Sequence, residues 1–281
     1  LAMAQGRYQE GRVVDLRSAA DKDLFLIGDI HAKASRIQEI FSHADLHARL
    51  QKQEAVVVFL GDLFHREEHD RAGEMESSIE TFEILMDLKR QYPDHLYALL
   101  GNHEFTRTER CKQGYFQGQL FRQALEDKGW GELYEQFVAA SPLVVIHPHC
   151  VGVHAAPARS VRDLQELRSL PLSDGTVAEL HPAVIELTCQ RHTLWSPSHE
   201  KAYTDYDVDD FLILCGVPGT HLITGHTPLN RDTGWKWPMG PRNTVIFAAG
   251  REVGYVQAQA DGLRFVRLGR SLLHEIGRAH V

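Results

Sequence analysis

The amino-acid sequence predicts an α/β fold in which two mixed β-sheets pack together and helices flank them. In the first part of the chain, short apolar runs alternate with stretches whose apolar residues recur at helical spacing. In the last third, apolar segments follow one another with short turns between them, as at Asp261-Gly262. The first pattern predicts parallel strands joined by right-handed crossovers. The second predicts antiparallel strands, so together they favour two packed sheets with helices outside.

The first part of the chain contains three predicted strands and two predicted helices. The strands are the apolar runs over 24–28, 56–60 and 96–100. Helices are expected over 32–52 and 74–91, because apolar side chains form one stripe along each segment. Pro93 ends the second helix, because proline cannot continue it. This alternating order predicts that the three strands lie parallel in one sheet.

The second part of the chain predicts two further helices and then a second sheet. The helices are expected over 116–139, with a break near Gly129. Apolar runs over 143–146 and 150–153 flank His147-Pro148-His149, which predicts a β-hairpin with exposed turn histidines. The remaining expected elements are helical segments over 157–187 and 207–214 and strands over 222–224, 244–248, 254–258 and 263–268.

The 281 residues are expected to form one main domain over 21–270, without internal repeats or low-complexity linkers. An N-terminal segment, 1–20, precedes this domain. A tail, 271–281, looks foreign to the protein, and we expect it to contribute nothing to the fold.

Composition disfavours several classes of function. The chain carries 30 basic and 38 acidic side chains, and its net charge of −8 disfavours binding to nucleic acid. No apolar run reaches about 18 residues, so no membrane span is expected. The four cysteines form no CxxC pair and residues 1–20 lack a secretory signal pattern, which favours reduced thiols in the cytoplasm. The oligomeric state is not predicted by these patterns.

Three short strings at the ends of the first three strands carry most of the chemistry. They are Gly28-Asp29-Ile30-His31, Gly61-Asp62-Leu63-Phe64-His65-Arg66 and Gly101-Asn102-His103-Glu104. Ligands of open α/β sheets bind at the carboxyl ends of strands. Neighbouring strands should therefore deliver these polar side chains to one crevice.

The strand ends supply enough donors for two metal ions. Asp29 and His31 lie two residues apart on one side of the chain, and Asp62 can bridge because a carboxylate has two oxygens. A second ion would share Asp62 and take donors from later strand ends, which are Asn102, His154 and His226. Mixed nitrogen and oxygen ligation suits Mn, Fe, Zn or Co. Two metal ions make phosphate ester chemistry the leading interpretation.

Taken in order, the strings Gly-Asp-Ile-His, Gly-Asp-x-x-x-Arg, Gly-Asn-His-Glu, Val-His-Ala and Gly-His resemble the calcineurin-like metallophosphoesterase superfamily. The chain is most similar to its phosphoprotein phosphatase branch, as a divergent, bacterial-type member. The similarity to this branch rests on Glu104 and the string Leu194-Trp195-Ser196. The resemblance covers roughly residues 24–249 and implies a four-layer αββα sandwich.

The resemblance also implies a role for each matching residue. Asp29, His31 and Asp62 would hold one divalent ion, and the ligands of the other would be Asp62, Asn102, His154 and His226. Mn²⁺ is the ion most expected in vitro, and a hydroxide bridging the two ions would attack phosphorus in line. His103 would protonate the leaving oxygen, and Arg66 would clamp two phosphate oxygens.

Several positions depart from the family pattern. His65 stands where the family has the aspartate that orients the catalytic histidine, a role that Glu104 or another carboxylate could take. Ala32 replaces a usual glycine. A second phosphate-binding arginine is expected between Trp195 and Gly225, where the chain has none. The residues that could substitute for it are Arg191, Lys201 and Arg231.

The leading hypothesis is a two-metal phosphomonoesterase that acts on phosphoserine and phosphothreonine or on small phosphorylated molecules. The first alternative is a symmetrical dinucleoside-polyphosphate hydrolase of the same superfamily. The second is a catalytically silent metal-binding scaffold. Silent members usually lose a ligand or the catalytic histidine, and this chain keeps all of them.

Overall fold

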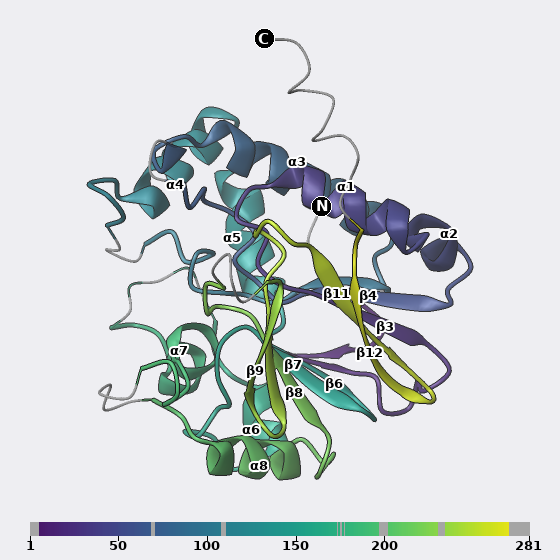
Figure 1. The fold of residues 1–281 in the computed structure, drawn as a ribbon. Coiled ribbons are helices and arrows are strands. Elements are labelled where there is room, and N and C mark those ends of the chain that lie inside the picture. The colour runs from purple at the N-terminus through teal and green to yellow at the C-terminus, as the bar shows by residue number, and fades with distance from the viewer. Residues whose placement is uncertain are drawn as a thin grey trace.

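The computed structural model describes residues 6–68, 71–107, 111–172, 174, 176, 178–196, 202–229 and 234–269. Its strands form one sheet of seven strands and one of five, and helices lie on the outer sides of both (Figure 1). This arrangement confirms the predicted fold class of two packed mixed sheets flanked by helices.

The five-stranded sheet holds the strands that carry the three motifs. Its parallel strands are β3 (Asp23–Ile27), β4 (Ala55–Phe59) and β5 (Leu96–Ala98), as the alternating pattern predicts. β11 (Gly254–Gln259) pairs antiparallel with β3, and β12 (Gly262–Arg267) forms the edge. The carboxyl ends of β3, β4 and β5 therefore open at one end of the sheet.

The seven-stranded sheet is built around the predicted hairpin of β6 (Val144–His147) and β7 (Cys150–Val153). β8 (His221–Thr224) runs parallel to β7, and β10 (Asn243–Ile246) runs parallel to β8. The strands that the sequence analysis does not predict are β1 (Gln9–Glu10), β2 (Val13–Asp15) and β9 (Lys236–Gly240). Because β2 pairs with β6, part of the N-terminal segment 1–20 belongs to this sheet.

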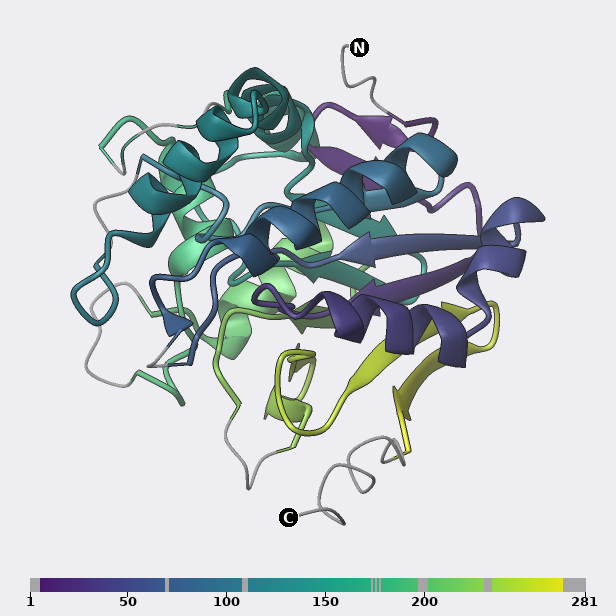
Figure 2. The ribbon, with the colours of Figure 1, turned by 90° about the horizontal axis from the view of Figure 1, so that it is seen from above.

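The described helices divide between the two sheets (Figure 1). On the side of the five-stranded sheet lie α1 (Ala34–His43), α2 (Leu46–Gln51), α3 (Glu76–Gln91), α4 (Gln117–Asp127) and α5 (Gly131–Ala140). Figure 2 shows α1 and α3 side by side across this sheet. On the side of the seven-stranded sheet lie α6 (Leu164–Arg168), α7 (Pro182–Cys189) and α8 (Asp205–Leu214). Among the described residues, every helix is too short or too polar to cross a membrane.

Two expectations about local structure are wrong. The single helix predicted over 32–52 is two helices, because Asp45 adopts a left-handed φ of 51° between α1 and α2. His147 is not an exposed turn residue, because it ends β6 and is 1% exposed. The predicted break between α4 and α5 is confirmed, with Gly129 at a φ of 71°.

Buried residues fill the space between the two sheets and the space between each sheet and its helices. Along β3, Leu24 and Leu26 belong to the buried cluster that also contains Val145 of the other sheet. Phe25 and Ile27, which alternate with them, belong to the cluster that contains residues of α1 and α3. Side chains alternate between the faces of a strand, so β3 buries both faces and its sequence is continuously apolar.

Candidate metal centre

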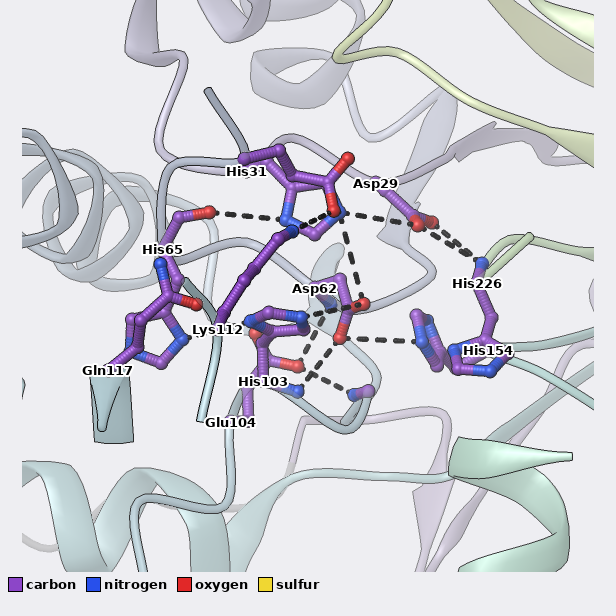
Figure 3. Close-up of polar contacts among 12 residues, drawn as sticks. Asp29, His31, Asp62, His65, His103, Glu104, Lys112, Gln117, His154 and His226 are labelled. Atoms are coloured by element: carbon purple, nitrogen blue, oxygen red, sulfur yellow. Dashed lines mark hydrogen bonds and ion pairs between the residues drawn. The ribbon is translucent and has the colours of Figure 1, made fainter. Parts of the chain in front are cut away.

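Loops at the ends of five strands supply the predicted metal ligands, which are Asp29, His31, Asp62, Asn102, His154 and His226. Two groups of donor atoms come together here, each with all atoms within 4.8 Å of one another. One group is His31, Asp62 and His103, and the other is Asp62, His154 and His226 (Figure 3). Asp62 belongs to both groups, as expected of a shared carboxylate.

Asp29 fixes the geometry of one side of the centre. Its two oxygens each accept a bond of 3.1 Å from the backbone N–H of His226. Its own carbonyl oxygen accepts a bond of 3.1 Å from the N–H of Ala248, just after β10. Asp29 also forms an isolated parallel bridge with Phe247. The end of β3 is thereby joined to the other sheet, so both sheets contribute to the site.

His31 presents one ring nitrogen to the two carboxylates. Its Nδ1–H donates to the carbonyl oxygen of His65 at 3.2 Å, since a carbonyl can only accept. Its Nε2 lies 3.8 Å from Asp29 Oδ2 and 4.0 Å from Asp62 Oδ2. A histidine held through one nitrogen with the other directed at carboxylates is typical of a metal ligand.

His154 shows the same arrangement on the other side of Asp62. Its Nδ1–H donates to the carbonyl oxygen of Leu60 at 2.9 Å. Its Nε2 is buried, has no hydrogen-bond partner among the described residues, and lies 3.4 Å from Asp62 Oδ1. The ring of His226 meets that of His154 edge-on at 5.2 Å. A divalent cation is the partner that this buried Nε2 lacks, so the donor set fits a metal ion.

The buried charges of the centre perturb one another. Burial raises the pKa of Asp29 well above its ordinary value. Burial opposes the charges of Asp62 and His154, but their mutual attraction outweighs it. The pKa of Asp62 is therefore well below its ordinary value, and that of His154 rises to about 9. The Asp62 carboxylate therefore favours a positive charge beside it.

The backbone at the site is held in uncommon conformations. His31, Asp62 and His226 have left-handed φ values of 46°, 50° and 62°. Such residues cost on the order of 1–3 kcal/mol each and cluster at functional sites. Gly225 has a separate reason to be glycine, because a Cβ there would collide with Asp29 Oδ1. The structure around these predicted ligands must therefore stabilise their left-handed backbone conformations.

His103 lies against the Asp62 carboxylate. Its backbone N–H donates to Asp62 Oδ1 at 2.9 Å, and its ring Nε2 is 4.0 Å from Asp62 Oδ2. Its Nδ1 shares a hydrogen bond of 3.1 Å with Nδ1 of His65, which is 2% exposed. Burial lowers the pKa of His103 well below its ordinary value and that of His65 to about 3. The hydrogen bond to His65 therefore orients the His103 ring.

Glu104 does not take the orienting role suggested for it. It is fully buried, and its Oε2 accepts from the N–H groups of Gly101 and Asp62 at 2.6 and 2.9 Å. Its Oε1 accepts from the N–H of Leu63 at 2.8 Å. The carboxylate thus ties the third motif to the second and fixes the loop that carries Asp62. The glutamate in the Gly-Asn-His-Glu string is the signal that could have indicated this.

Arg66 and Asn102 belong to the loops that follow β4 and β5 at the centre. Arg66 Nη1 donates to the carbonyl oxygen of Ala32 at 3.3 Å, next to His31. Its Nε lies 3.1 Å from Glu68 Oε2. Asn102 is 4% exposed. Phosphate binding by Arg66 and metal binding by Asn102 stay predictions.

A family model described as calcineurin-like phosphoesterase matches residues 23–241. The chain belongs to this family. The strings that suggest the family in the sequence lie within this matched region and converge at the centre described above.

Two relatives show what this calcineurin-like phosphoesterase is similar to. A catalytic subunit of protein phosphatase 2A from Dictyostelium discoideum is 27% identical over 162 residues, which cover 57% of this chain and 46% of that protein. The match thus spans about half of that relative's length. A protein serine/threonine phosphatase of Saccharomyces cerevisiae with similarity to human phosphatase PP5 superposes with a TM-score of 0.66 at 14% identity. The superposition covers 94% of this chain and 84% of the yeast chain, and it shows that the two share a fold.

Of the three residues suggested as a second phosphate-binding cation, the structure of this calcineurin-like phosphoesterase describes Arg191. Arg191 makes no ion pair with the metal centre among the described residues. Lys201 and Arg231 lie outside the described residues, as does the tail 271–281. A different cation, Lys112, lies at the centre, and no motif in the sequence singles it out.

Proposed function

We propose that this member of the calcineurin-like phosphoesterase family is a two-metal phosphomonoesterase. Its expected substrates are phosphoserine and phosphothreonine residues or small phosphorylated molecules. The proposal rests on the position of Asp62, whose Oδ1 faces His154 while its Oδ2 faces His31. A carboxylate with a separate donor beside each oxygen is suited to two cations at once.

The donor set supports two divalent ions. Asp29, His31 and Asp62 would hold one, and the ligands of the other would be Asp62, Asn102, His154 and His226. Nitrogen and oxygen donors suit Mn²⁺, Fe²⁺, Zn²⁺ and Co²⁺, and we propose Mn²⁺ for activity in vitro. When bound, such ions supply Lewis-acid stabilisation of phosphoryl oxygens and an activated water.

The protein's own side chains would position the substrate and supply the proton. Arg66 would bind two phosphate oxygens through its planar fork, from its place beside the His31 loop. His103, whose Nε2 faces the Asp62 side of the centre, would donate a proton to the leaving oxygen. The hydrogen bond between the Nδ1 atoms of His103 and His65 limits rotation of the ring. The name of the Dictyostelium relative makes phosphopeptides the first substrates to test.

The test is a substrate panel on the purified chain with each of the four metals. Asp62→Asn and Asn102→Ala should abolish hydrolysis of p-nitrophenyl phosphate and phosphopeptides. Circular dichroism shows whether each variant is folded, and the amount of bound zinc or manganese shows how much metal it holds. Asp87→Asn, whose side chain is 50% exposed on α3, is the matched control and should keep full activity. Near-normal rates in either site variant would remove the proposed centre.

The same panel separates the alternatives. Hydrolysis of diadenosine tetraphosphate with none of phosphopeptides would replace the proposal by a dinucleoside-polyphosphate hydrolase. Binding of two metal ions per chain without hydrolysis of any phosphate ester would indicate a scaffold. A single bound ion per chain would contradict the two-metal mechanism.

A further inference from the structure

Lys112 brings an ammonium group to the rim of the candidate metal centre. Its Nζ forms an ion pair of 2.5 Å with Glu67 Oε1. The same Glu67 oxygen lies 3.7 Å from Nε2 of His31, a predicted metal ligand. Figure 3 shows the lysine side chain running past the His65 and His103 rings with its end next to His31. One carboxylate oxygen thus separates the lysine from the centre.

A defined turn fixes the backbone of Lys112. Lys112 and Tyr115 pair across the turn through backbone hydrogen bonds of 2.9 and 3.0 Å. Gln113 and Gly114 have left-handed φ values of 55° and 86°, as a tight turn of this kind requires. The lysine therefore stands on a formed turn at the edge of the site.

The start of α4 is anchored to the loop that carries Arg66. Gln117, which is 4% exposed, donates from its side chain to the carbonyl oxygens of Arg66 and Ala72 at 2.9 and 2.8 Å. The turn that carries Lys112 and the loop that carries Arg66 are therefore held together through Gln117.

The ion pair with Glu67 holds the side chain of Lys112 in place. Lys112 Nζ and Glu67 Oε1 are 2.5 Å apart, and the two side chains are each 31% exposed. Lys112 is thus partly buried and held against the rim of the centre.

We propose that Lys112 is the second cation that binds the phosphoryl group of the substrate, and that Glu67 holds it ready until phosphate arrives. The inference rests on the proposed function. The described part of the segment 195–225, which is 195–196 and 202–225, contains neither arginine nor lysine. At the centre, the turn before α4 supplies a cation through Lys112. A phosphate dianion would displace Glu67 from Lys112, while Arg66 binds on the other side.

Phosphate binding to the Mn²⁺-loaded full chain tests this role by isothermal titration calorimetry, with inorganic phosphate as the probe. Lys112→Met keeps the apolar stem and removes the charge, so the dissociation constant should rise about tenfold or more, as expected for a lost hydrogen bond to a charged group. Lys112→Arg should retain most of the affinity. Lys128→Met, an exposed lysine at the end of α4, is the matched control and should bind like the wild type.

Glu67→Gln distinguishes a waiting cation from a structural ion pair. If Glu67 competes with phosphate for Lys112, this variant should bind phosphate more tightly, by roughly threefold for a competitor worth about 0.7 kcal/mol. The gain should disappear in the double variant with Lys112→Met. In steady-state assays, Lys112→Met should raise KM for p-nitrophenyl phosphate more than it lowers kcat.

Each result has a definite meaning. Wild-type phosphate affinity in Lys112→Met, with normal folding by circular dichroism, would overturn the inference and leave the proposed function standing. Equal weakening by Lys112→Met and Glu67→Gln would also overturn it, because the pair would then only hold the turn. A metal-loaded wild type that neither binds phosphate nor hydrolyses esters would overturn the proposed function, and the role of Lys112 with it.

Discussion

Glu104→Gln should destabilise the fold although the two side chains have nearly the same shape. The carboxylate is fully buried and accepts three backbone hydrogen bonds of 2.6 to 2.9 Å. A glutamine has one acceptor oxygen, and its NH₂ group must face at least one of the three N–H groups. The best arrangement keeps the bonds from Gly101 and Asp62 and leaves the N–H of Leu63 opposite a donor.

The expected loss follows from these contacts. Losing one bond to a charged acceptor and leaving one N–H buried without a partner each cost about 1–3 kcal/mol. Burial, and after it repulsion from Asp62, raises the pKa of Glu104 to about 7. The neutral amide of glutamine removes this repulsion, which offsets part of the lost stability. The net loss of unfolding free energy should be about 3 kcal/mol.

Urea unfolding at pH 8 measures this loss, because the carboxylate is mostly ionised there in the wild type. A loss of about 3 kcal/mol corresponds to a drop of about 1 M in the midpoint for a protein of this size. Glu83→Gln, an exposed glutamate on α3, is the matched control and should unfold with the wild type. A Glu104→Gln midpoint equal to that of the control would refute the idea that this carboxylate fixes the Asp62 loop.

Three other expectations follow from the structure. His103→Asn should slow hydrolysis of alkyl phosphates far more than that of p-nitrophenyl phosphate, whose leaving group needs no proton; equal losses would argue against an acid role. Gly225→Ala should weaken metal binding in titrations of the apoprotein, because its Cβ would displace Asp29, and unchanged affinity would contradict this. Burial, and after it the nearby His149, lowers the pKa of His147 to about 4. Between pH 6.5 and 4, the His147 side chain therefore takes up a proton in the unfolded chain but not in the folded one. Stability should fall by up to about 3 kcal/mol as the pH drops through that window, and His147→Gln should remove this part of the loss in unfolding curves.

The strands at the site could be predicted because their sequence pattern is unusually strong. β3 buries both faces, so Leu24 to Ile27 form an unbroken apolar run, and the glycine after it marks where the strand ends. A strand end followed by a carboxylate and a histidine then locates the donors. The convergence of Asp29 and Asp62 follows from strand order alone, because both follow neighbouring parallel strands. His154 follows a strand of the other sheet, so its place beside them depends on the packing of the two sheets.

The contacts that the sequence does not reveal are long-range or very local. The strands β1 and β9 have no apolar pattern, because β1 has two residues and β9 is mostly exposed. The pairing of Lys112 with Glu67 joins residues 45 apart through a turn that propensity does not place. Burial of His147 depends on packing around β6, whereas His-Pro-His by itself is typical of an exposed turn.

The charges at the centre also bear on which esters it would hydrolyse. Glu104 is bound by backbone N–H groups and Glu67 by Lys112, so among the described residues at the centre Asp29 and Asp62 are left to balance bound cations. Two divalent ions would exceed that negative charge, and Lys112 adds a further positive charge at the rim. A phosphate monoester carries two negative charges near neutral pH and a diester carries one, so a site with this excess of positive charge should bind monoesters more tightly. A preference for diesters over monoesters in the substrate panel would contradict this balance of charges.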